Sequence, residues 1–182
     1  MKNAFLITIL LMSLFGFSQK EGQDFCKGDF IDGAYFELAP MKKKIFWYNT
    51  YYFEECLGTK DINGIKYLEY KQTWKNGNSD LLYLRNDKGK VFQFEKGFQK
   101  ETIRFDPKFK VDYVWDKADK TAVYTIKSFE GRLVTPYCKY ENLLIIEAKY
   151  ANVTYEFYYL KGLGYIGATQ NNKLVSYITP EI

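Results

Sequence analysis

The sequence contains no histidine among its 182 residues, only four prolines, and no Cys-x-x-Cys pair. The missing imidazole excludes Ser-His-Asp and Cys-His catalytic arrangements and every zinc site that needs a histidine ligand. A strong excess of one charge is also missing, because 26 Lys and Arg residues stand against 22 Asp and Glu residues. We therefore expect no cofactor and no nucleic-acid partner, since nucleic-acid binding needs a concentrated positive surface.

Long apolar runs are absent after Phe17, and the one run before it lies at the start of the chain. Residues 4–17 are almost wholly apolar, follow Lys2 and lead into the small residue Ser18. This layout is typical of a secretory signal peptide, with cleavage expected after Ser18. An uncleaved anchor or a buried helix is the alternative, although the run is short for a bilayer. We expect an exported protein, periplasmic or secreted, whose mature chain has no transmembrane segment.

The rest of the chain has no internal repeat and no low-complexity linker, and its length suits one domain. We divide the sequence into a signal peptide at residues 1–18, an N-terminal arm at residues 19–44 and a single β-meander domain at residues 45–182. Export permits disulfides, and three cysteines allow at most one internal bridge. Of the three pairings we favour Cys26–Cys56, which would pin the arm to the first strand. Buried free thiols are the alternative.

Strand-forming residues dominate the region between Ile45 and Ile178, where short runs of Tyr, Phe, Ile, Val and Thr alternate with turn residues. The region holds about 11 such runs, one per about 12 residues, and no window has the period of a long helix. The fold class that we predict is all-β. It is an antiparallel up-and-down meander that forms a barrel or half-barrel of about 10–12 strands.

The strand limits are predicted from the turn residues between the runs. Asn63-Gly64 and Asn76-Gly77 are expected hairpin turns, because these residues tolerate positive φ. Glu130-Gly131 is expected to be a turn between two strands. The first run, residues 45–53, is expected to form one strand.

Several runs gather aromatic and branched side chains on one face of the predicted sheet by their alternation. A sheet of sequential hairpins curls so that this face lines the inside. We predict that the inside holds an apolar or amphipathic ligand, such as a lipid, by burying its apolar surface. Core filling by the rings themselves is the other interpretation. The residues expected to line the site are Leu68, Tyr70, Trp74, Leu82, Leu84, Phe92 and Phe94.

A cell-envelope interaction or structural module without a ligand is the alternative function. Residues 45–53 carry more rings than one face can hold, so the outward half of this run is a candidate contact surface for an envelope protein, with Trp47 and Tyr51 as its expected members. The preceding residues Lys42-Lys43-Lys44 could contact anionic groups. Three charges are also typical of a solvated run that keeps an aromatic strand from aggregating.

Carboxylates are the acid–base groups that remain in a chain without histidine. A carboxylate-based hydrolase would need two of them at a set distance. Glu54 and Glu55 point to opposite faces of a strand. Nothing in the sequence brings the other candidates together, which are Glu69, Glu95, Glu101 and Glu147. We therefore predict a protein without enzymatic activity.

Two segments near the C-terminus resemble parts of uncharacterised exported bacterial β-rich proteins. Residues 158–167 read as an aromatic strand followed by Lys-Gly, an aliphatic residue and glycine, and residues 135–147 read as a proline turn before an aliphatic strand. In pattern these proteins are similar to the half-barrel fold of the periplasmic lipoprotein carriers. The resemblance, best over residues 136–178, implies that fold and an exported compartment, and it implies no catalytic residues. Cys138 stands where a glycine is common in those proteins.

Overall fold

The computed structural model describes residues 26, 33–38 and 42–180. Twelve antiparallel strands between Lys43 and Thr179 form a single sheet. The order of strands in the sheet is β6-β5-β4-β3-β2-β1-β12-β11-β10-β9-β8-β7. The all-β meander predicted from the sequence is thus confirmed. The strands are β1 (Lys43–Trp47), β2 (Thr50–Ile62), β3 (Ile65–Trp74), β4 (Ser79–Asp87), β5 (Lys90–Glu95), β6 (Lys100–Phe105), β7 (Val114–Asp116), β8 (Ala122–Val134), β9 (Lys139–Tyr150), β10 (Thr154–Leu160), β11 (Gly164–Gln170) and β12 (Lys173–Thr179).

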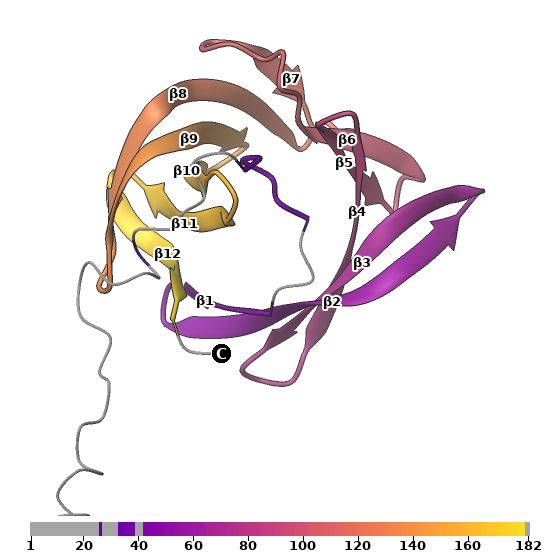
Figure 1. Cartoon of the computed structure of the whole chain (residues 1–182), viewed down its shortest axis with the longest axis horizontal. Helices are drawn as coiled ribbons and strands as arrows, with labels where there is room; N and C mark the ends of the chain where they lie inside the picture. The colour runs from indigo at the N-terminus through magenta and orange to yellow at the C-terminus, as the bar shows by residue number, and fades with distance from the viewer. Residues whose placement is uncertain (1–25, 27–32, 39–41, 181–182) are drawn as a thin grey trace, which may run out of the picture.

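The sheet curls into a nearly closed barrel because its first and last strands pair with each other (Figure 1). Ile45 of β1 lies opposite Ile178 of β12. The edges of the sheet are β6 and β7, which follow one another in the chain. Contacts that involve side chains join this seam: the Trp115 indole N–H donates to the Ile103 carbonyl at 2.7 Å, and the Ala118 amide donates to the Thr102 hydroxyl at 2.9 Å.

Residues 45–53 form two strands, so the expectation of one strand is wrong. Tyr48 and Asn49 make a tight turn between β1 and β2, and Tyr48 adopts a positive φ of 52°. The turn places Phe46 opposite Tyr51 across the hairpin. Tyr48 occupies a position that is usually glycine or asparagine, so the sequence contains no typical turn signal here.

Gly131 lies inside β8, so the turn expected at Glu130-Gly131 is also wrong. The pairing of β8 with β9 shifts register on both sides of Gly131, which marks β-bulges. A Cβ atom at this position would lie 2.5 Å from Cγ1 of Ile145. Glycine is therefore needed here because β8 passes too close to β9 to leave room for a side chain.

Aromatic rings and aliphatic side chains of the C-terminal strands form the main core. Ile126, Leu144 and Ala148 are fully buried there. Residues 33–38, which we call the N-terminal segment, enter the barrel next to this core (Figure 1). In this segment Phe36 stacks on Tyr159 with 4.2 Å between ring centroids. The expected signal peptide at residues 1–18 lies outside the described residues.

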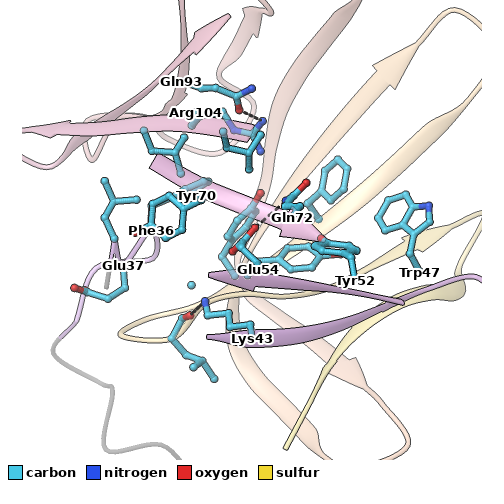
Figure 2. A pocket seen from close by; sticks show the side chains of 18 of the residues that line it. Phe36, Glu37, Lys43, Trp47, Tyr52, Glu54, Tyr70, Gln72, Gln93 and Arg104 are labelled. Atoms are coloured by element: carbon cyan, nitrogen blue, oxygen red, sulfur yellow. Dashed lines mark hydrogen bonds between the residues drawn. The ribbon is translucent and has the colours of Figure 1, made fainter. Parts of the chain in front are cut away.

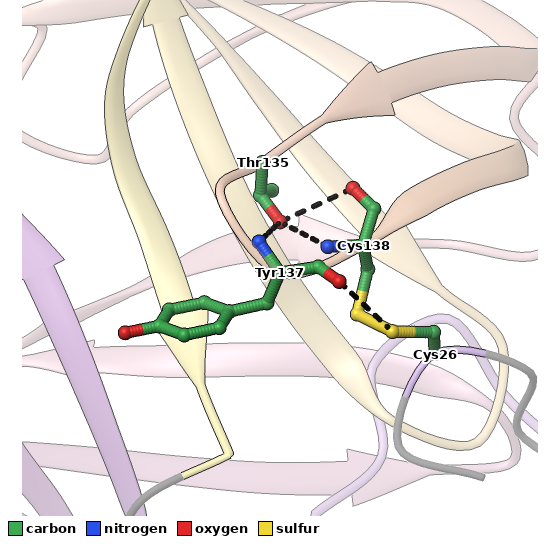
Figure 3. Close-up of a disulfide and its surroundings, with 4 residues drawn as sticks. All are labelled: Cys26, Thr135, Tyr137 and Cys138. Carbon is green, nitrogen blue, oxygen red and sulfur yellow. Dashed lines mark hydrogen bonds between the residues drawn. A yellow bond between two sulfur atoms is a disulfide. The ribbon is translucent and has the colours of Figure 1, made fainter. Parts of the chain in front are cut away.

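The disulfide joins Cys26 to Cys138, so the favoured Cys26–Cys56 pairing is wrong (Figure 3). Cys138 lies in the turn between β8 and β9, where its amide donates to the Thr135 hydroxyl at 3.0 Å. Cys56 is not part of a disulfide. Cys26 therefore lies at this turn and not at β2, although Cys56 is closer to it in sequence. Within the described ranges, no helix is long and apolar enough to cross a membrane.

Candidate functional site

A cavity of about 360 Å³ lies inside the barrel. Side chains of β1 to β6 and of β8 to β11 form its walls, and Phe36, Glu37 and Leu38 of the N-terminal segment contribute to them. The volume is at the lower end of the range of about 300–1,000 Å³ that is typical of small-molecule sites. The wall combines aromatic rings, leucines and several charged or amide side chains, so it suits a molecule with both apolar and polar parts.

The alternation of β3 and β4 places the predicted residues of these strands on the inner face. Tyr70 lies opposite Leu82 in the hairpin, and Leu68 lies opposite Leu84. Tyr70, Leu82 and Leu84 line the cavity. Leu68 shares their face through its pairing with Leu84, and the Trp74 ring packs at 4.7 Å from that of Tyr52, a cavity residue.

Phe92 and Phe94 lie on the outer face of β5, which corrects their assignment to the lining. Gln93, between them, lines the cavity, and successive side chains of a strand point to opposite faces. Phe92 is paired with Arg85, whose guanidinium lies 4.1 Å from the ring centroid. Phe94 packs with Tyr67 and Tyr83 in a small outer cluster.

Trp47 and Tyr51 lie on different faces, so they do not form one contact surface. Trp47 lines the cavity. Tyr51 is outside, opposite Phe46, and the two ring centroids are 5.8 Å apart. The outer ring layer continues to Tyr177, which stacks on Phe46 at 5.2 Å, and to Phe53, 5.7 Å from Tyr51.

Polar side chains inside the cavity were not predicted from the sequence (Figure 2). Arg104 and Gln93 lie at one end in this view, Lys43 lies at the opposite end, and Glu54 and Gln72 lie between them. The Gln72 amide donates to Glu54 at 2.8 Å, and the Arg104 guanidinium donates to Gln93 at 3.1 Å. The cavity thus has one cation at each end, Arg104 at one and Lys43 at the other.

Lys43 is the one member of the Lys42-Lys43-Lys44 run that lines the cavity. Its ammonium donates to the Leu163 carbonyl at 2.6 Å. Burial lowers the pKa of Lys43, whereas the negative charges of Glu54 and Glu37 act to raise it. Lys42 and Lys44 instead lie over the rings of the outer layer, with Lys44 5.0 Å from the Tyr51 centroid. The run is thus divided between the cavity side and the outer side of the sheet.

Arg104 lies on the inner face of β6, where alternation from Thr102, the partner of the cavity residue Gln93, places it. The pairing of β5 with β6 places Phe92 opposite Ile103 and Val91 opposite Phe105, so Arg104 is the extra residue. The bulge places the side chains of two successive residues on the inner side of the sheet. Arg104 lines the cavity, and Phe105 stacks on Phe36 with 5.5 Å between centroids.

The carboxylates considered for a hydrolase lie in separate contacts. Glu95 is 3.9 Å from Lys117, and Glu147 is 4.0 Å from Lys127. Glu101 accepts two hydrogen bonds from Arg85 on the outer side. Across the part of the chain that the structure describes, no three His, Cys, Asp or Glu side chains gather where they could hold a metal ion.

Comparison with known proteins gives one distant structural likeness. No family model and no curated protein matches the chain. A solved structure described as a "putative lipoprotein" from Parabacteroides distasonis ATCC 8503 is similar with a TM-score of 0.44 and 13% sequence identity, over 81% of this chain and 96% of that one. The function must therefore be argued from this chain's own geometry.

Proposed function

We propose that the protein is an exported, non-enzymatic binding protein that holds an apolar or amphipathic small molecule inside its barrel. The observation that carries this proposal is the cavity of about 360 Å³ and its mixed aromatic and polar wall. Barrels of this kind either fill their interior with side chains or hold one small ligand. Here side chains fill the region beside β8 and β9 and leave a chamber next to it.

Export is part of the proposal for two reasons. The first 18 residues have the layout of a signal peptide. The Cys26–Cys138 bond is of a type that persists in oxidising compartments such as the periplasm or the extracellular space. Together they support a protein that meets its ligand outside the cytoplasm.

Two neighbouring leucines of β4 offer a matched test of the cavity. Leu82 lines it, whereas Leu81 is 45% exposed on the outer face. Leu82→Trp should fill the chamber and abolish uptake of a fluorescent fatty acid, and Leu81→Trp should leave uptake unchanged. Circular dichroism checks that both variants fold, and Leu84→Phe provides a milder filling variant.

The binding proposal fails on either of two results. One is equal uptake by the Leu82→Trp and Leu81→Trp variants. The other is a purified protein that neither carries extractable lipid by mass spectrometry nor takes up the fluorescent fatty acid.

The outer layer of rings on β1, β2 and β12 favours a second candidate, an envelope interaction module. Phe46, Tyr51 and Tyr177 form this layer, and Lys44 and Lys75 lie over the Tyr51 ring. Because Trp47 is inside, Tyr51→Ala and Trp47→Ala separate the two functions. Loss of a specific envelope partner in a pull-down with Tyr51→Ala, with retention in Trp47→Ala, would favour the interaction module.

A further inference from the structure

Arg104 is a charged side chain in the cavity wall without a carboxylate partner. Its guanidinium donates to the neutral amide of Gln93, lies 6.0 Å from the Tyr124 ring centroid and contacts the Tyr159 hydroxyl. No carboxylate among the described residues lies within ion-pair distance of it. An arginine remains charged at every physiological pH and offers five N–H donors. Most of its hydrogen-bonding capacity is therefore left for another group.

The other cations near the cavity are compensated. Lys117 is paired with Asp119 at 2.6 Å and lies 3.9 Å from Glu95. Lys43 donates to the Leu163 carbonyl and is attracted electrostatically by the carboxylates of Glu54 and Glu37. Arg104 thus differs from its neighbours, although an enclosed charge without an opposite charge is costly. This difference points to a ligand that supplies the missing charge.

The surroundings of Arg104 add hydrogen-bond donors without adding negative charge. Burial raises the pKa of Tyr159 and of Tyr150, so both phenols stay protonated at neutral pH and can donate. Both rings line the cavity. An anionic oxygen at this end would meet a guanidinium and neutral phenols.

We propose that Arg104 binds the carboxylate of an amphipathic acid whose apolar body packs against the leucines and rings of the same cavity. This inference rests on the proposed function and specifies the ligand class. The planar fork of N–H groups on a guanidinium matches the two oxygens of a carboxylate. Leu84 of β4, paired with Gln93, and Phe36, stacked on Tyr159, provide apolar surface beside this end.

Calorimetric titration of the full mature protein with dodecanoate and with dodecanol tests the head-group assignment. The wild type should bind dodecanoate about 10- to 100-fold more tightly than dodecanol, as expected for hydrogen bonds between charged groups. Arg104→Met should remove that preference and retain dodecanol binding. Arg104→Lys should keep part of it, because the charge remains and the fork is lost.

Lys149→Met is the matched control, because Lys149 is exposed on β9 and its loss removes the same charge from outside the cavity. It should keep the full preference for dodecanoate. Equal binding of dodecanoate and dodecanol by the wild type would overturn the head-group assignment while leaving the proposed function in place. An unchanged preference in Arg104→Met, or tighter binding of dodecyl phosphate than of dodecanoate, would also overturn it. Binding of none of these probes would instead contradict the proposed function.

Discussion

Asp119 shows how a single carboxylate next to the cavity is held in its charged form. Its side chain is only 6% exposed, and it accepts hydrogen bonds from the Lys117 ammonium at 2.6 Å and from the Thr121 amide at 2.9 Å. Burial acts to raise the pKa of Asp119, but these hydrogen bonds outweigh it and lower the pKa to about 2. The charged form therefore stabilises the fold.

Stability should consequently fall in acid. A carboxylate with a depressed pKa in the folded state contributes stability above its unfolded pKa, about 3.9, and loses it as pH falls through the folded value. We expect Asp119→Asn to lower the free energy of unfolding by about 1–3 kcal/mol at pH 7. The difference from wild type should shrink between about pH 4 and pH 2, as measured by urea unfolding. A difference that stays constant down to pH 2 would contradict this role.

At the level of single side chains, sequence alternation predicted part of the cavity wall. It was sufficient for Tyr70, Leu82 and Leu84, because no register shift interrupts the β3–β4 pairing. It was insufficient for Phe92, because the two-residue turn at Lys88-Gly89 pairs even positions of β4 with odd positions of β5. A two-residue turn at Lys88-Gly89 could have been predicted from the sequence, and it would have placed Gln93, not Phe92, on the same face as Leu84.

Among the elements, the N-terminal segment depends on one close backbone contact. The Gly162 amide donates to the Ala34 carbonyl at 2.9 Å. A Cβ atom on Gly33 would lie 2.3 Å from Cα of Gly162. Because this is a backbone atom, a rotation of a side chain could not relieve the clash. The segment can thus follow its path only with glycine at position 33.

Gly33→Ala should therefore displace the N-terminal segment and remove Phe36 from its stack. We expect a loss of about 1–3 kcal/mol in the free energy of unfolding, as for overpacked sites. Faster hydrogen exchange at the Gly162 amide would locate the change. Gly97→Ala is the control, because nothing lies within 4 Å of a Cβ atom there. Equal effects of the two substitutions would refute the contact.

Element boundaries were predictable where the turn chemistry was ordinary. The expected run at residues 65–74 coincides with β3, and Asn63-Gly64 forms the turn before it. Prediction failed at Tyr48, which adopts positive φ despite its bulk, and at Gly131, which serves packing within a strand. The inward placement of Phe105 after Arg104 belongs to the same group, because bulges depend on contacts between strands that the local sequence does not encode.

For the whole molecule, the Cys26–Cys138 bond links residues 112 positions apart. Closing a loop of this length restricts the unfolded chain and contributes about 5 kcal/mol in the chain-entropy model. We expect Cys26→Ser/Cys138→Ser to lower the free energy of unfolding by about that amount, measured by urea unfolding, and reductant to reproduce the loss in the wild type.

Cys56→Ser is the control for this prediction, because Cys56 is not in a disulfide. It should remain as sensitive to reductant as the wild type and differ little from it in stability. A wild type whose unfolding is indifferent to reductant would show that the bond does not stabilise the barrel in solution.

The pairing of β1 with β12 also has a consequence for how the chain matures. β1 begins at Lys43 and β12 ends at Thr179, so the barrel cannot close until the chain between these two residues has been synthesised. Because the N-terminal part of the chain is synthesised first, the edge of β1 that pairs with β12 has no hydrogen-bonding partner until the β11–β12 hairpin has been made. Pairing between strands so far apart in sequence slows folding, and it leaves an unpaired strand edge exposed in the meantime, which promotes aggregation. Assembly of this barrel is therefore expected to be post-translational, and a chain that stops short of β12 should aggregate.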